Sequence, residues 1–291
     1  MFIETNIQKI GNLGNFILDL ALLQKSELNL LYQLKTICEE EHINYWLNGG
    51  SLLGAIKYHG MVPWDDDIDI GMLRSDYDRF VATVEKRFGS TSRYGIISDL
   101  KYNEYGVTWA KFIDHSTKIS EDFDFSSGTV FIDIMPFDKV SNHKLTQFTD
   151  KLWFHIIDHI IKERCLRIIN KHFKYSLLIK MVDLPLNFLT QHWSIKELKQ
   201  YRYNFITRHS TDMNAIIYMN YASWYQWGYE YVYLDEVSKA NKISFSGFQV
   251  NIPIKYQEII KRMYGDIAQT PDETEQKPKH VKAFCELPID N

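Results

Sequence analysis

The chain has 291 residues, and its 33 lysines and arginines against 37 aspartates and glutamates give a formal net charge of −4. With 45% hydrophobic and 24% charged residues it has an ordinary globular composition, which excludes a disordered or collagen-like chain. The mild acidity argues against a dedicated nucleic-acid-binding protein, so no nucleic-acid partner is expected. Cys38, Cys165 and Cys285 are far apart in the sequence, which suits a reducing cytoplasm.

The N-terminal segment does not resemble a secretory signal, because Glu4 comes early and Asp19 interrupts the apolar residues. The sequence also lacks the run of about 20 apolar residues that a membrane-spanning helix needs. We therefore expect a cytoplasmic protein, in contact at most with the inner face of the membrane.

The first predicted elements alternate helices with short strands. Apolar residues at helical spacing predict a helix over 16–41, and residues 43–47 have the character of a short strand. Ser51 is expected to cap a short helix that continues to Tyr58. The elements predicted next are a strand containing 67–70, a helix from Ser75 to about Gly89, strands over 107–113 and 129–134, and a long amphipathic helix within 152–169.

The helical region 152–180 is rich in basic residues. Between 160 and 180, lysines and arginines face the single acid Glu163. The region is therefore a candidate for peripheral contact with an anionic membrane face. A helix packed on the core, with its basic side chains in water, is an equal alternative.

The clearest chemical signal is the aspartate cluster Asp65, Asp66, Asp67 and Asp69. Carboxylates a few Å apart repel by about 1 kcal/mol in water and about 4 kcal/mol when partly buried, so the cluster predicts a bound cation. On a strand, Asp67 and Asp69 point to the same face with Cα atoms about 6.6 Å apart, a spacing that suits Mg²⁺. Asp133, between two isoleucines, completes a three-carboxylate site if its strand is a neighbour.

Gly49 and Gly50 precede a predicted helix and offer backbone N–H groups where a phosphate can dock. A metal site beside a phosphate site is suited to phosphoryl or nucleotidyl transfer. Two other motifs are excluded: Ile70 stands where an EF-hand needs glycine, and Ala55 stands where a P-loop needs lysine. An exposed acidic turn remains the alternative for residues 65–69.

Three segments resemble the LicD family, which includes bacterial phosphocholine transferases and is related to the fukutin-type ribitol-phosphate transferases. Residues 48–80 carry the runs NGGSLLGAIK, HG, VPWDDDIDIG and RSDYDRF, and residues 131–138 carry FIDIMPFD. Residues 261–265, KRMYG, resemble the family's closing motif less specifically. The resemblance covers roughly 30–140 well and 230–280 loosely.

The resemblance implies an α+β fold of the nucleotidyltransferase type: a small mixed sheet flanked by helices, with a helical insertion and a C-terminal extension. Three parts are expected: a catalytic core with N-terminal helices over 1–142, a helical insertion over 143–215, and a C-terminal part over 216–291 that completes the cleft. The resemblance further implies that Asp67, Asp69 and Asp133 surround Mg²⁺, with Mn²⁺ as the alternative ion.

The resemblance also implies a CDP-activated donor, commonly CDP-choline, and transfer to a sugar hydroxyl of a cell-surface glycan or its lipid-linked precursor. In our hypothesis Asp67 and Asp69 hold Mg²⁺ against the donor diphosphate. Asp133 then joins the metal or takes the proton of the acceptor hydroxyl, and CMP leaves. Substrate contacts are further predicted for Gly49, Gly50, Ser51, Lys57, Lys111, Trp224 and Trp227.

An aromatic run, in which eight of the sixteen residues 218–233 are Tyr or Trp, includes Trp224 and Trp227. Aromatic faces hold a quaternary ammonium with about 0.5–2 kcal/mol each, which suits choline. Packing of the run in the core or at an interface is the alternative.

The same residues leave two other functions open. A nucleotidyltransferase would attack the α-phosphate of an NTP and release pyrophosphate instead of CMP. A catalytically silent relative would bind glycans without turnover, and would fail to bind Mg²⁺ or any nucleotide.

Overall fold

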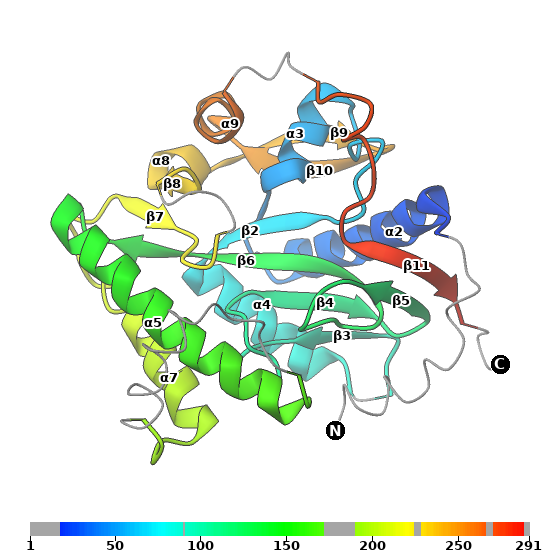
Figure 1. Cartoon of the computed structure of the whole chain (residues 1–291). Coiled ribbons are helices and arrows are strands. Elements are labelled where there is room, and N and C mark those ends of the chain that lie inside the picture. The colour runs from blue at the N-terminus through cyan, green and yellow to red at the C-terminus, as the bar shows by residue number, and fades with distance from the viewer. Residues whose placement is uncertain (1–17, 90, 172–189, 224–227, 266–269, 288–291) are drawn as a thin grey trace.

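The computed structural model describes residues 18–89, 91–171, 190–223, 228–265 and 270–287, and every structural statement below concerns these residues. A mixed sheet lies at the centre of the molecule (Figure 1). Its main path runs in the order β1 (Trp46–Leu47), β2 (Asp69–Leu73), β6 (Val130–Val140), β4 (Ala110–Asp114) and β3 (Tyr94–Ile97). Two short strands, β7 (Ile217–Met219) and β8 (Tyr231–Tyr233), continue the sheet from the end of β6. The α+β prediction is confirmed.

The two strands that carry the acidic motifs are neighbours. Strands β2 and β6 run parallel, and Asp69 is the register partner of Asp133. Strand β4, which carries Lys111, pairs antiparallel with β6 on the side away from β2. Lys111 therefore does not lie between the two acidic strands in space, although it does in the sequence.

Helices α2 (Leu20–Glu40) and α4 (Arg74–Arg87) lie behind the sheet in Figure 1. Helix α2 begins where Asp19 accepts a hydrogen bond from the N–H of Leu22 at 3.0 Å. Its leucines at helical spacing, such as Leu23 and Leu30, are fully buried, which confirms the predicted amphipathic helix.

Three predicted boundaries are wrong. Helix α3 (Gly49–Lys57) begins two residues before Ser51, whose Oγ instead accepts the backbone N–H of Asp69 at 2.9 Å. Helix α4 begins at Arg74 with Leu73 at its N-cap and without a side-chain cap, so Ser75 does not open it. Strand β2 begins only at Asp69, which places Asp67 in the loop before the strand.

The predicted helical insertion contains α5 (Lys144–Ile168) and α7 (Ile195–Ile206), which pack on each other (Figure 1). Two buried cations of α7 bind the loop that precedes β4. The ammonium of Lys199 donates to the backbone oxygens of Tyr102 and Tyr105, each at 2.6 Å, and Arg202 donates to that of Gly106 at 2.9 Å. These backbone hydrogen bonds, together with the ion pairs that both cations make with Asp99, offset the cost of burying the two charges.

The C-terminal part returns to the catalytic core. It contains α8 (Leu234–Val237), β9 (Ala240–Phe245), β10 (Phe248–Pro253), α9 (Tyr256–Tyr264) and β11 (Val281–Glu286). Strand β11 pairs antiparallel with β5 (Thr117–Glu121), so the last described strand lies against the core (Figure 1). Within the described ranges, no helix combines the length and apolar character that crossing a membrane requires.

Candidate active site

A cavity of about 420 Å³ opens where β2 and β6 begin to run side by side. Six acidic residues line it: Asp65, Asp67, Asp69, Glu121, Asp133 and Glu230. Three basic residues line it: Lys111, Lys279 and His280. The structure thus brings together the three aspartates predicted to form the site, and it surrounds them with more acidic than basic side chains.

The glycine pair makes room for two of these carboxylates. Gly49 has a φ of +52°, and a Cβ atom there would lie 2.9 Å from Oδ2 of Asp69. A Cβ atom on Gly50 would lie 2.9 Å from Oδ2 of Asp65. A side chain at either position would therefore force the neighbouring carboxylate to shift, and at Gly49 it would also be strained by the positive φ. Gly50 also lines the cavity, where its predicted phosphate contact remains a prediction.

Burial and mutual repulsion keep the aspartates from ionising easily. Burial raises the pKa of Asp67 to about 7, with Asp133 and Asp66 adding to the effect. Burial raises the pKa of Asp65 to about 8, with Asp67 and Asp66 contributing. The pKa of Asp69 also lies well above its usual value, because the group is buried near Asp67 and Asp133.

This set of oxygen ligands fits a hard divalent cation such as Mg²⁺, which would offset the repulsion. A metal ion needs several ligand atoms close together. Among the described residues, Asp66, Asp67 and His280 each offer a possible metal-ligand atom, and these three atoms lie within 4.8 Å of one another. The Asp66 carboxylate already accepts backbone N–H groups, so we assign that set to loop closure. Asp69 and Asp133 lie outside it, and one ion shared with Asp67 would require the three carboxylates to approach more closely.

Asp133 is held from one side by two donors. The indole Nε1 of Trp109 donates to its Oδ1 at 3.1 Å, and Nζ of Lys111 lies 3.5 Å from the same oxygen. Lys111 is buried, lies 3.6 Å from Oε2 of Glu121, and sits 3.0 Å from the ring centroid of Phe131. Burial raises the pKa of Asp133, and Lys111 opposes that rise. Lys111 is therefore the buried counter-ion of the third aspartate.

The C-terminal segment closes the cavity through Asp66. Its carboxylate accepts the backbone N–H groups of Lys279 at 3.2 Å, His280 at 2.8 Å and Val281 at 2.6 Å. Nε2 of His280 then lies 3.5 Å from Oδ2 of Asp67. Sequence reasoning missed Lys279 and His280. The signal available to it was the basic run KPKHVK, which the acidic residues just before it obscure.

Residues 42–173 match the family described as LicD/FKTN/FKRP, nucleotidyltransferase domain. The lipopolysaccharide cholinephosphotransferase LicD of Haemophilus influenzae is 28% identical over 88% of this chain and 93% of its own length. Residues 42–173 therefore form a nucleotidyltransferase domain of the LicD type, and the similarity to LicD itself extends over most of the chain. Ribitol 5-phosphate transferase FKRP of Homo sapiens is 35% identical over 27% of this chain, a match that covers 14% of FKRP. An uncharacterized protein of Rickettsia prowazekii, RP689, is 44% identical over 16% of this chain and 19% of its own length.

Two of the residues predicted to contact substrate have structural partners. Ser51 anchors the start of β2 through the N–H of Asp69, beside the cavity but not in its lining. Nζ of Lys57 donates to Oγ1 of Thr270 at 2.8 Å, and Lys57 is likewise absent from the lining. A phosphate contact by either residue remains a prediction.

The aromatic run lies largely away from the aspartates. Trp224 and Trp227 fall outside the described residues. Among its described aromatic residues, Tyr221 packs against Phe154 at 5.3 Å between ring centroids, and none of these aromatic residues lines the cavity. The run instead contributes an acid: buried Glu230 lines the cavity and accepts a hydrogen bond from Nδ2 of Asn48 at 2.6 Å.

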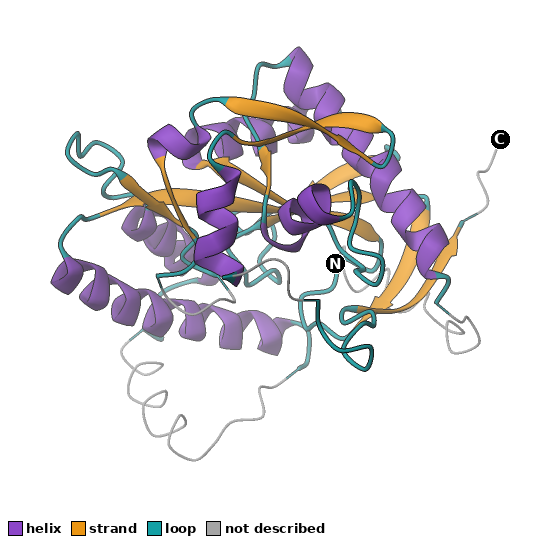
Figure 2. Cartoon of the chain, turned by 90° about the horizontal axis from the view of Figure 1, so that it is seen from above, coloured by secondary structure: helices purple, strands orange, loops and turns teal. Residues whose placement is uncertain are grey.

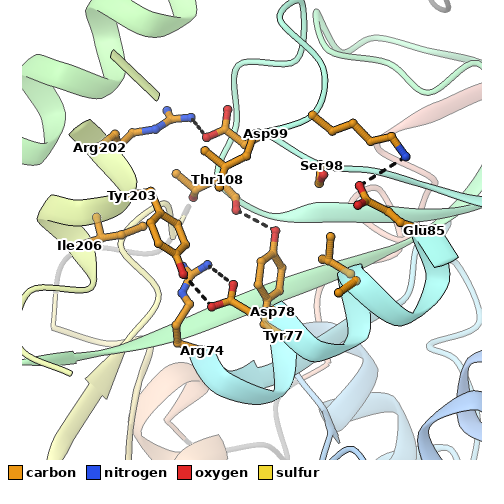
Figure 3. Close-up of a pocket in the computed structure, with 14 residues that line it drawn as sticks. Arg74, Tyr77, Asp78, Glu85, Ser98, Asp99, Thr108, Arg202, Tyr203 and Ile206 are labelled. Atoms are coloured by element: carbon orange, nitrogen blue, oxygen red, sulfur yellow. Dashed lines mark hydrogen bonds and ion pairs between the residues drawn. The ribbon is translucent and has the colours of Figure 1, made fainter. Parts of the chain in front are cut away.

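A second cavity of about 510 Å³ lies between α4 and α7 (Figure 3). Its charged groups are paired with one another or with the core. Arg74 binds Asp138 through two hydrogen bonds of 2.8 and 2.7 Å, and Tyr203 donates to Asp78 at 2.7 Å. None of the three candidate catalytic aspartates lines this cavity. The three candidate aspartates thus single out the first cavity as the candidate active site.

Proposed function

We propose that this protein transfers a phospho-alcohol from a CDP-activated donor to a sugar hydroxyl of a cell-surface glycan or its lipid-linked precursor. Phosphocholine from CDP-choline is the first substrate to test, because the relative matched over nearly its whole length is named a cholinephosphotransferase. The observation that carries the proposal is the register pairing of Asp69 with Asp133, which gathers acidic groups in one cavity.

The balance of charge supports a metal-dependent reaction. Six acidic residues face three basic ones in the cavity, and a donor diphosphate adds more negative charge. We assign Asp67 and Asp69 to hold Mg²⁺, or Mn²⁺ in its place, while Asp133 either joins them at the metal or takes the proton of the acceptor hydroxyl. When bound, the ion polarises the donor diphosphate and offsets its charge.

The chain's own groups position the reactants. Lys279 and His280 are candidates to contact the donor phosphates, because Asp66 fixes their backbone beside Asp67. The acceptor oxygen forms a bond to the phosphorus that bears the alcohol, and the bond from that phosphorus to CMP breaks. The hydroxyl proton passes to a carboxylate, for which Asp133 is our candidate. Positioning and charge neutralisation supply most of the catalysis in such a reaction.

Product identification tests the proposal. The protein is titrated in Mg²⁺ with CDP-choline, CDP-ribitol and CDP-glycerol, and each binding donor is incubated with glycan acceptors while CMP is measured by chromatography. We expect CMP release, its loss in Asp69→Asn, and its retention in the matched control Asp235→Asn, whose side chain is exposed. Pyrophosphate released from an NTP would instead establish a nucleotidyltransferase, and undiminished CMP release by Asp69→Asn would contradict the assigned site.

A further inference from the structure

Helix α5 carries an exposed apolar stripe that contributes nothing to the core. Leu145, Phe148 and Leu152 are 76%, 62% and 55% exposed. Their spacing of three and four residues places them on one side of the helix. The opposite side, with Phe154 and Ile161, is buried. Exposed leucines are common singly, but a contiguous stripe indicates an interaction surface.

Three exposed aromatic side chains stand beside this stripe. Nε1 of Trp153 donates to the hydroxyl of Tyr201 at 3.2 Å, and the ring of Tyr201 lies 5.4 Å from that of Trp193 in an edge-on contact. All three are among the large exposed hydrophobic residues. Trp and Tyr combine an apolar body with a polar tip, which suits the boundary between lipid and water.

The charges of α5 are sorted by side. Lys144 and Lys151 are seven residues apart, so they follow the same flank of the stripe. Asp150 and Asp158 are buried, and they pair with Arg208, just after α7, and with Arg202 of α7, respectively. The helix's remaining acid, Glu163, pairs with a basic residue one turn later. The outward side of α5 is therefore apolar and basic.

We propose that this surface, made of Leu145, Phe148, Leu152 and the three aromatic residues, docks onto an anionic lipid bilayer. The apolar side chains enter the headgroup region while the flanking lysines attract acidic lipid headgroups. Helix α5 lies on the side of the molecule opposite α2 (Figure 1 and Figure 2). The apolar stripe, from Leu145 to Leu152, begins before the region 152–180 that the sequence predicted as the membrane contact. Residues 172–180 of that region fall outside the described residues.

Vesicle flotation of the full chain tests this proposal without reference to catalysis. The test variant combines Leu145→Glu, Phe148→Glu and Leu152→Glu. The matched control combines Met213→Glu, Ile216→Glu and Leu234→Glu, which replace exposed apolar residues elsewhere. With phosphatidylcholine vesicles that contain about 30% of the anionic lipid phosphatidylglycerol, we expect the wild type and the control to float. The test variant should lose at least about tenfold in binding.

Other readouts separate the competing occupants. Lys144→Ala with Lys151→Ala should weaken binding to anionic vesicles and leave the weaker binding to pure phosphatidylcholine unchanged.

CMP release toward a water-soluble acceptor should be the same in the stripe variant and the wild type, so a failure of the proposed function would not affect the flotation result. Equal flotation of the stripe variant and the wild type overturns the proposal. So does light scattering that shows a lipid-free wild-type dimer and a monomeric stripe variant, because the stripe would then join two copies.

Discussion

Asp69 on β2 lies directly beside Asp133 on the parallel strand β6, and both side chains line one cavity. Two such groups destabilise the metal-free fold once they ionise. Because the folded-state pKa of Asp69 is raised above its unfolded value, its contribution to stability falls as pH rises through the folded pKa.

We therefore predict that removal of divalent ions lowers the Tm of the wild type at pH 8. Adding Mg²⁺ at 100 times its Kd should stabilise the fold by about 2.7 kcal/mol. In Asp69→Asn the Mg²⁺-dependent rise should disappear, while the Tm in EDTA should equal or exceed that of the wild type. Differential scanning fluorimetry measures both, with Asp235→Asn as the control. A full Mg²⁺ response in Asp69→Asn would show that this carboxylate is not a ligand.

Gly49 should tolerate no side chain, because its φ is positive and the Asp69 carboxylate occupies the place of a Cβ. We predict that Gly49→Ala lowers kcat at least about 100-fold by displacing Asp69 and destabilises the fold by about 1–2 kcal/mol through backbone strain. Gly89→Ala is the matched control, since nothing lies within 4 Å of its added Cβ. Steady-state kinetics and thermal unfolding test this. Wild-type kcat in Gly49→Ala would mean that Asp69 need not keep its position.

Asp66 should hold residues 279–281 of the C-terminal segment in place, because its carboxylate accepts three consecutive backbone N–H groups there. We predict that Asp66→Ala costs about 2–4 kcal/mol, since several hydrogen bonds to a charged group are lost together. Hydrogen exchange should accelerate over 279–286, and the KM for the donor should rise as Lys279 and His280 lose their place.

The control for this prediction is Asp122→Ala, which removes an exposed ion pair of 2.8 Å between Asp122 and Lys282. Lys282 lies in β11, the strand that begins at Val281, the last of the residues held by Asp66. Asp122→Ala should leave the Tm and the exchange rates unchanged, because exposed pairs contribute little. Unchanged exchange over 279–286 in Asp66→Ala would refute the fastening role.

The three candidate aspartates could be identified from the sequence alone. Both signals for them, the strand alternation and the aspartate-rich motif, involve residues that are close together in the sequence. Alternation wrongly places Asp67 on the strand, because β2 begins at Asp69, where the backbone N–H bonds to the side chain of Ser51 and not to a neighbouring strand. The position of Lys279 beside the cavity could not be predicted from the sequence. Asp66 binds the backbone N–H of Lys279, which is 213 residues away, and every residue except proline has such an N–H group.

Buried cations were also invisible in the sequence. Lys199 and Arg202 resemble the polar face of an amphipathic helix, where lysine and arginine are normally solvated. Both are fully buried, because backbone oxygens of a distant loop replace water around them. The sequence does not reveal where such a loop will lie, so the close packing of the helical part on the core could not be predicted.

Asp158 on α5 provides the last test, because it binds buried Arg202 and also Lys162 at 2.8 Å. Burial alone would raise the pKa of Asp158, but the two cations outweigh it and hold the pKa below its usual value. Its stabilising contribution is therefore fully present above the unfolded pKa of about 4 and is lost as pH falls through the lower folded value. Asp158→Asn should cost about 3–5 kcal/mol at pH 7, since breaking a buried pair leaves Arg202 undercompensated.

Urea denaturation at pH 7 and near pH 3 measures both effects of Asp158. The difference between the wild type and Asp158→Asn should shrink at the lower pH, because protonation removes the same charge that the substitution removes. Asp124→Asn, at an exposed pair with Lys171, should match the wild type at both pH values. A constant difference between the wild type and Asp158→Asn across this range would show that packing, and not the charge of Asp158, joins α5 to α7.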